Sequence, residues 1–131
     1  MHYDPKERVL MEKVALELLE EMQQVCANMG SRLVVMYIPP LYDVQPQFQE
    51  PLINLALASA KLVHEDLKHT DQLADTVRKH AEGLGISFVD LREPYRAASE
   101  FLYWGSDHHI NIRGNEVAAE ALGATLRDLV F

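Results

Sequence analysis

A helix-like segment, a glycine and a short apolar run occur in this order twice along the chain, and this repeat constrains the fold most. The first run, Arg32–Pro40, follows Gly30, and the second, Ile86–Leu91, follows Gly83 and Gly85. A short, continuous apolar run is typical of a strand that is buried on both faces, as in a parallel sheet. Parallel strands need a long crossover connection, which is usually helical. The repeat therefore predicts an α/β fold in which a parallel sheet lies between two layers of helices.

Apolar side chains recur every three or four residues in the segments 4–29, 50–65, 71–84 and 113–129, and this spacing predicts helices. A shorter helix is expected over residues 93–99. The glutamate-rich face of the first helix is expected to be solvated, opposite an apolar face formed by Leu10, Val14, Leu18, Met22, Val25 and Met29. Because no linker, repeated domain or low-complexity stretch divides the chain, residues 1–131 are predicted to form a single domain portion.

The charge of the chain argues against two classes of partner. With 20 Asp and Glu against 12 Lys and Arg, the formal net charge is −8, which disfavours nucleic acid and anionic membrane surfaces. The single cysteine, Cys26, cannot form an internal disulfide, and its apolar helical setting predicts a small core residue. No apolar run approaches the roughly 18 residues of a membrane span, and the first residues are unlike a signal peptide. As written, the chain would stay in the cytoplasm, but the sequence does not fix the compartment, because an export signal would lie on another part of the protein.

Residues that can carry chemistry gather in the stretch Leu102–Leu122, just before a helical segment rich in alanine. Asp107, His109, Asn111 and Gly114 form the pattern D-x-H-x-N-x-x-G. A carboxylate that holds one imidazole nitrogen leaves the other nitrogen free to take a proton, as a general base requires. Side chains two residues apart in an extended segment lie on the same side. The stretch therefore offers an orienting Asp and a base His, although the same residue types also satisfy backbone groups at helix starts.

This stretch resembles the last conserved block of the SGNH/GDSL hydrolase superfamily, in which an Asp and a His complete a Ser-His-Asp triad. The spacing of Asp107, His109 and Gly114 is similar to that in alginate O-acetyltransferase-like proteins and in proteins with an Asp-His-His-Trp signature. The resemblance implies a flavodoxin-like, three-layer fold and an esterase or O-acyltransferase activity without cofactor or metal. It implies an acyl ester or acetylated carbohydrate as substrate, Asp107 and His109 as catalytic residues, and a chain that corresponds to the C-terminal half of the domain.

A serine nucleophile for this pair is not recognisable in the sequence. None of the five serines of the chain lies in a Gly-Asp-Ser or a G-x-S-x-G motif. These serines are Ser31, Ser59, Ser87, Ser99 and Ser106. Acyl transfer through serine also needs oxyanion donors, which the other half of the family's domain carries. The chain is therefore interpreted as a fragment that supplies the Asp–His pair, and turnover by the chain alone is not expected.

Several residues near the pair are candidates for binding substrate or supporting the site. His108 is expected to point away from the base and to line the crevice, and Asn111 is expected to brace the turn. Tyr103 and Trp104 either contact an acyl group or a sugar, or pack the base of the loop. Asp90, at the end of the second apolar run, either caps the next turn or orients a residue of the crevice.

Two other functions remain open. A metal-binding module would use Asp107, His108 or His109, and Asp90 as ligands. Zinc sites usually draw three or four ligands from separated elements, however, and the sequence has no second cluster at ligand spacing. A non-catalytic interaction domain is the other reading. The open edge and apolar surface of a half-sheet would favour a homodimer, or pairing with the missing N-terminal half.

Overall fold

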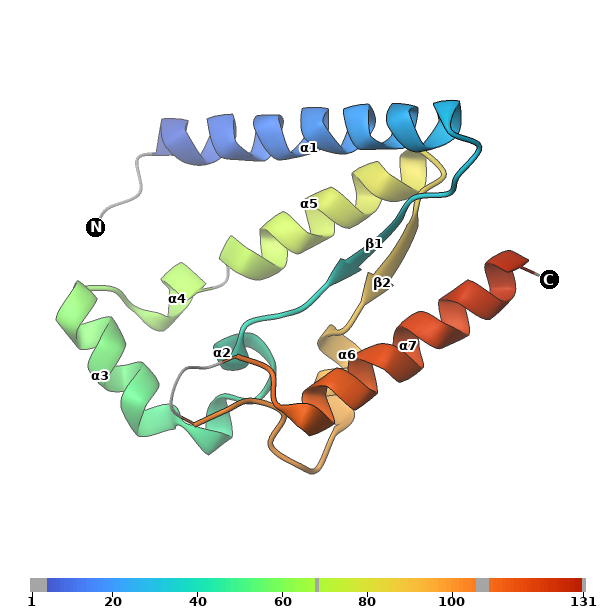
Figure 1. Cartoon of the computed structure of the whole chain (residues 1–131). Helices are drawn as coiled ribbons and strands as arrows, with labels where there is room; N and C mark the ends of the chain where they lie inside the picture. The colour runs from blue at the N-terminus through green and yellow to red at the C-terminus, as the bar shows by residue number, and fades with distance from the viewer. Residues whose placement is uncertain (1–4, 68, 106–108, 131) are drawn as a thin grey trace. The chain divides into compact units, whose positions relative to one another are not determined.

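The computed structural model describes residues 5–67, 69–105 and 109–130 of the chain, which form a mixed α/β structure that is mostly helical (Figure 1). Strands β1 and β2 pair in a small parallel sheet, and each lies inside one of the two predicted apolar runs. The three-layer part of the predicted fold remains a prediction. The elements in chain order are α1 (Pro5–Asn28), β1 (Val34–Tyr37), α2 (Leu41–Val44), η1 (Pro46–Phe48), α3 (Glu50–Ala60), α4 (His64–Leu67), α5 (His69–Gly83), β2 (Ser87–Asp90), α6 (Arg92–Ala97) and α7 (Ile112–Val130).

The repeated glycine signal has the same physical basis at both strands. Gly30 and Gly85 adopt left-handed φ values of 67° and 71°, which favour glycine. Directly after each glycine, a backbone N–H reaches back five residues to a helix carbonyl, from Ser31 to Cys26 at 2.8 Å and from Ile86 to Ala81 at 2.9 Å. Both helices therefore end in the same way and turn the chain directly into a strand.

The predicted end of the helix over residues 50–65 is wrong. The segment predicted as one helix over 50–65 is divided into α3 and α4, because Lys61 adopts a left-handed φ of 56°. The N–H of Leu62 then bonds the carbonyl of Leu57 at 2.9 Å, which closes α3 as a glycine would. A lysine carries no local signal for this conformation.

The chain divides into two compact units, and the division passes through the middle of both strands. The first unit comprises the residues up to 35 together with 71–88, and the second comprises 36–70 together with the residues from 89 onward. In the first unit, α1 and α5 pack through a core of Leu19, Ala81 and Ile86, which are at most 6% exposed. Five partly buried apolar side chains pack against this core: Leu33, Val35, Val77, Leu84 and Phe88.

The predicted apolar face of α1 is not the face that packs in this unit. Its side chains are 45–75% exposed, although they follow the helical period along the whole element. A second row, Leu16, Leu19 and Cys26, is buried or half-buried instead. α1 thus has two apolar rows, and the structure leaves the longer of them in contact with solvent.

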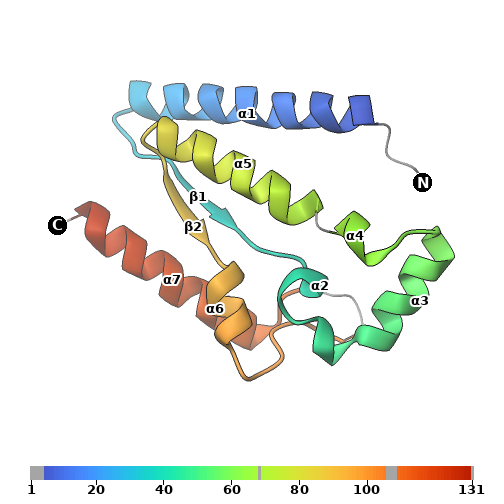
Figure 2. The same ribbon diagram turned by 180° about the vertical axis from the view of Figure 1, so that it is seen from behind.

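The second unit contains the short helices after β1, the end of β2, and helices α6 and α7, which lie side by side (Figure 2). Its buried side chains include Leu41, Leu91, Tyr95, Leu102 and Tyr103. Tyr95 donates a hydrogen bond to the carbonyl of Gly114 at 2.9 Å, which ties α6 to the first turn of α7. This contact fixes the beginning of α7, whose first turn contains the last residues of the D-x-H-x-N-x-x-G stretch.

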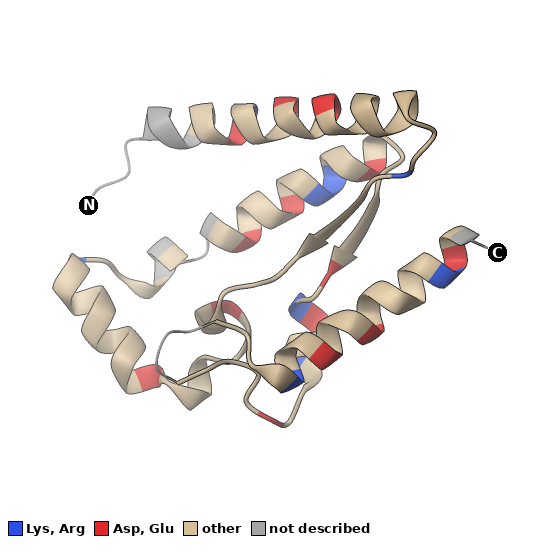
Figure 3. Ribbon diagram, viewed as in Figure 1, with Lys and Arg blue, Asp and Glu red and all other residues tan. Residues whose placement is uncertain are grey.

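Charged side chains are dispersed over the described residues: acidic residues predominate on α1, whereas acidic and basic residues both occur along α5 and α7 (Figure 3). Within the same residues, no helix combines the length and the apolar character that crossing a bilayer would demand.

Candidate active site

The residues around His109 form a short antiparallel pair that precedes α7. Tyr103 and Ile110 form an antiparallel bridge, and the N–H of Trp104 donates to the carbonyl of His109 at 2.7 Å. Asp107 and His108 lie outside the described residues. The structure therefore describes the two arms of the turn and the predicted base, and the predicted acid remains a sequence-based assignment.

His109 and Trp104 lie opposite each other in this pair. Opposing residues of an antiparallel pair point to the same face, and neighbours along a strand point to opposite faces. The side chains of Trp104 and His109 therefore share one face, and Tyr103 and Ile110 share the other. The burial agrees with this assignment, because Trp104 is 49% exposed and His109 is exposed, whereas Tyr103 is only 3% exposed. The turn thus presents an indole beside an imidazole.

Asn111 holds the turn together through its side-chain amide and its backbone N–H. Its side-chain N–H donates to the carbonyls of Phe101 at 2.7 Å and Tyr103 at 3.2 Å. Its side-chain oxygen accepts the N–H of Gly114 at 2.9 Å, which caps α7, and its backbone N–H donates to Leu102 at 2.9 Å. These bonds give Asn111 a bracing role at the start of the helix.

Gly114 lies where the first turn of α7 passes very close to the loop. A Cβ at this position would overlap the carbonyl oxygen of Leu102 and would approach the Cβ of Ile110 to 3.2 Å. The glycine of the D-x-H-x-N-x-x-G pattern is therefore required by the close approach of two backbone segments, and not by an unusual φ.

Tyr103 is a core residue of the site. Its hydroxyl donates to the carbonyl of Pro39, directly after β1, at 2.7 Å, and its ring meets that of Tyr95 edge-on at 5.9 Å. Burial raises the pKa of Tyr103 strongly, and the nearby Tyr95, Asp43 and Tyr37 raise it further. The sequence leaves two alternatives for Tyr103 and Trp104: contact with a ligand, or packing at the base of the loop. The structure places Tyr103 in the packing at the base of the loop, whereas the side chain of Trp104 is accessible to a ligand.

The raised pKa of Tyr103 predicts a loss of stability at alkaline pH. In the unfolded chain this tyrosine ionises near pH 10, so its contribution is complete below that value and is lost as pH rises further, because the unfolded state then binds fewer protons. Tyr103→Phe should cost about 0.5–1.5 kcal/mol at pH 7 by removing the bond to Pro39. Urea titrations at pH 7 and above pH 10 should show this difference shrinking, and a constant difference would contradict the prediction.

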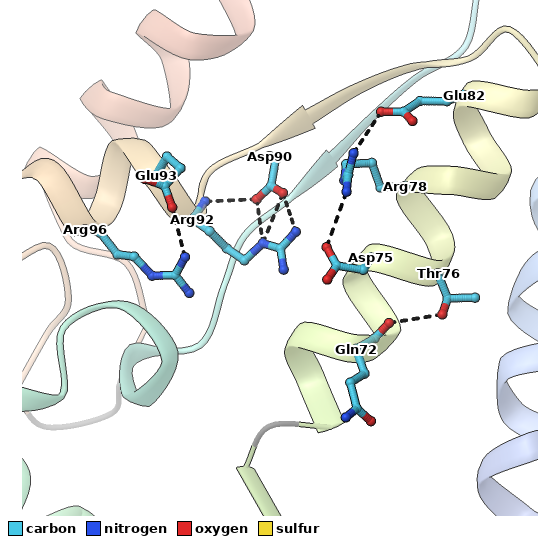
Figure 4. Close-up of polar contacts among 9 residues, drawn as sticks. All are labelled: Gln72, Asp75, Thr76, Arg78, Glu82, Asp90, Arg92, Glu93 and Arg96. Atoms are coloured by element: carbon cyan, nitrogen blue, oxygen red, sulfur yellow. Dashed lines mark hydrogen bonds and ion pairs between the residues drawn. The ribbon is translucent and has the colours of Figure 1, made fainter. Parts of the chain in front are cut away.

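Asp90 is engaged in capping and in an ion pair at the end of β2 (Figure 4). One of its carboxylate oxygens accepts the backbone N–H of Arg92 at 3.0 Å, and both oxygens accept the Nε–H of Arg92, at 2.9 and 3.0 Å. The guanidinium is 5.7 Å from the ring centre of Tyr37, and Arg92 is only 8% exposed. Asp90 therefore caps the turn that follows β2, the first of the two roles expected for it. Its carboxylate also neutralises the buried guanidinium of Arg92.

Two buried glutamines, which the sequence did not single out, contact the arm that leads to the turn. Gln45 is fully buried and Gln49 is 8% exposed. Both side chains bond backbone groups within residues 98–105. Among the described residues, no group of three or more His, Cys, Asp or Glu side chains is arranged to hold a metal ion.

Comparison with known proteins identifies one family. The family described as SGNH hydrolase-like domain, acetyltransferase AlgX matches residues 3–130. No curated protein and no solved structure gives a significant match. The resemblance stated from the Asp107–Gly114 stretch is thereby confirmed at the level of the family. Because the match covers almost the whole sequence, the chain belongs to the SGNH hydrolase-like domain family of the acetyltransferase AlgX.

Proposed function

We propose that this chain supplies the catalytic Asp107–His109 pair of an AlgX-type O-acetyltransferase that acts on an acetylated polysaccharide. The observation that carries the proposal is the antiparallel pairing of residues 102–104 with 109–111, which presents an exposed imidazole beside an exposed indole just before α7. Residues 1–131 are proposed to be one portion of a single SGNH-type domain. Their placement as its C-terminal portion remains a prediction from the sequence.

In the proposed reaction, His109 moves protons between three oxygen atoms. It takes the proton of a serine hydroxyl as the serine oxygen attacks the acetyl carbonyl, and it gives that proton to the departing alkoxide. A hydroxyl of the acceptor then attacks the acetyl-serine, loses its proton to His109, and the proton returns to the serine oxygen. Asp107 holds the ring in the required tautomer and stabilises the imidazolium. Water in place of the acceptor would make the same site an esterase.

The nucleophile and the oxyanion donors are proposed to come from outside these 131 residues. None of the serines lies in a nucleophile motif, and the hydroxyl of Ser59 donates to the carbonyl of Leu55 within its own helix at 2.8 Å. His108 is proposed to line the crevice. Trp104 is proposed to support a sugar ring, because an exposed indole offers a flat apolar face beside the base.

A second candidate is association with another polypeptide through α1. Six apolar side chains on one face of this helix are 45–75% exposed, and exposed apolar faces of this kind often mark protein contacts. A homodimer or pairing with the other half of the domain would cover them. Light scattering should then give a mass above that of one chain, and Leu18→Glu should reduce it. A well-folded monomer at high concentration would count against the homodimer.

The test of the proposed function is to label the protein at its native length with a fluorophosphonate, which reacts with activated serines. Mapping of the labelled peptide should place the serine outside these 131 residues, and the label should disappear in Asp107→Ala. A label on one of the five serines of this sequence would overturn the assignment of the nucleophile. A protein that is neither labelled nor able to release acetate from an acetylated oligosaccharide would overturn acyl transfer itself.

A further inference from the structure

Gln45 fixes the arm that leads to the candidate base. It follows α2 directly, and its side chain is fully buried. Its Oε1 accepts the N–H of Leu102 at 2.9 Å, and its Nε2 donates to the carbonyls of Glu100 at 2.8 Å and Ala98 at 3.5 Å. One amide thus satisfies donor and acceptor groups at both ends of a five-residue stretch of backbone. A buried amide with this many partners holds the stretch in a single conformation.

Gln49 acts on the same arm closer to the turn. It immediately precedes α3, and its Nε2 donates to the carbonyl of Gly105 at 3.2 Å. The approach is close, because a Cβ built on Gly105 would lie 3.4 Å from that nitrogen. Gly105 is four residues before His109, so Gln49 holds the chain at the point where it enters the turn.

The other end of the turn is held independently. The carbonyl of His109 accepts the N–H of Trp104, and Asn111 braces the carbonyls of Phe101 and Tyr103. The segment that joins Gly105 to His109 therefore begins and ends at restrained backbone groups. The two glutamines come from the region that follows β1, more than 50 residues away in sequence, which also holds this arm through the bond from Tyr103 to Pro39.

We infer that Gln45 and Gln49 are positioning residues, which fix the entry of the turn so that the ring of His109 meets its acidic partner. The inference rests on the proposed function, because it gives the glutamines a role in the Asp107–His109 pair. A glutamine that only stabilises the fold would change the free energy of unfolding. A positioning glutamine must also change the state of the His109 ring in protein that remains folded.

The experiment uses the protein at its native length and reads the proton on the His109 ring from long-range ¹H–¹⁵N correlations at mildly alkaline pH. In the original chain, the ring should carry its proton on Nδ1, where a carboxylate can accept it. Gln49→Met keeps the size of the side chain but removes the donor to Gly105, and should shift the ring from this form to a mixture of tautomers. Gln47→Met is the matched control, because Gln47 lies in the same turn but is exposed, and should leave the ring unchanged.

Two further variants separate the possible failures. Asp107→Ala should move the proton to Nε2. If the unsubstituted protein already shows the Nε2 form and Asp107→Ala changes nothing, Asp107 and His109 do not form a pair. The proposed function and the positioning role are then both wrong. If Asp107→Ala shifts the ring but folded Gln49→Met does not, the pair stands and the positioning role is overturned. If the Met variant does not fold, Gln49→Asn takes its place. Its side chain is one methylene group shorter, which moves the amide away from Gly105, and the state of the His109 ring is measured in the same way.

Discussion

Replacing His109 by alanine is expected to lower acetyl transfer by the native-length enzyme by about 10⁶-fold in kcat, the loss found when the base of a serine triad is removed. Without the imidazole, the serine hydroxyl keeps its proton and the alkoxide departs without one. KM should change little, because the ring acts on atoms whose charge changes only during the reaction. Rates with an acetylated oligosaccharide and with p-nitrophenyl acetate would measure both constants.

The structure indicates that this variant should fold. His109 is exposed, and its contact with Trp104 uses the backbone carbonyl, which alanine retains. His64→Ala is a suitable control, because His64 is also exposed and its ring contacts only a surface amide, that of Asn54 at 2.9 Å, among the hydrogen bonds described for it. The control should leave kcat unchanged. Near-original turnover in His109→Ala would end the assignment of this residue as the base.

Asp107→Asn should lower kcat by about 10⁴-fold, because an amide in place of the carboxylate favours the wrong tautomer of the histidine. This comparison matters here because Asp107 is assigned from the sequence pattern alone. If Asp107→Asn were as active as the original enzyme while His109→Ala was inactive, the base would stand and another residue would have to orient it.

The parts of the fold that could be predicted are those with local causes. The two strands were found because a glycine with positive φ ends the preceding helix and a short apolar run follows, at Gly30 and again at Gly85. Asn111 and Gly114 were singled out for the same kind of reason. A cap and a close approach at the start of a helix require particular residue types at fixed spacing.

Features that depend on distant packing could not be predicted. Periodicity shows that α1 has an apolar row from Leu10 to Met29, but it does not show that Leu19 and its neighbours pack against Ala81 and Ile86 instead. The two buried glutamines are a second example. Their partners lie 53–57 residues further along the chain, and a glutamine between prolines and aromatic residues has no local signature of burial.

Gly114→Ala is the substitution expected to destabilise the protein most, by roughly 3 kcal/mol. The added Cβ would overlap the carbonyl oxygen of Leu102, and neither partner can yield easily. Leu102 is held by Gln45 and Asn111, and the carbonyl of Gly114 is held by Tyr95. The higher helix propensity of alanine offsets only about 1 kcal/mol of this loss of stability. Urea unfolding followed by circular dichroism would measure the difference.

Gly123→Ala on the same helix separates the close approach from helix propensity. The nearest atom to a Cβ at Gly123 is the end of the Arg127 side chain at 3.9 Å, so alanine fits there without displacement. This variant should raise the free energy of unfolding by about 0.5–1 kcal/mol, whereas Gly114→Ala lowers it. Equal effects of the two variants would contradict the proposed contact with Leu102. A stable Gly114→Ala protein with an unchanged His109 ring would further show that the first turn of α7 does not set the geometry of the base.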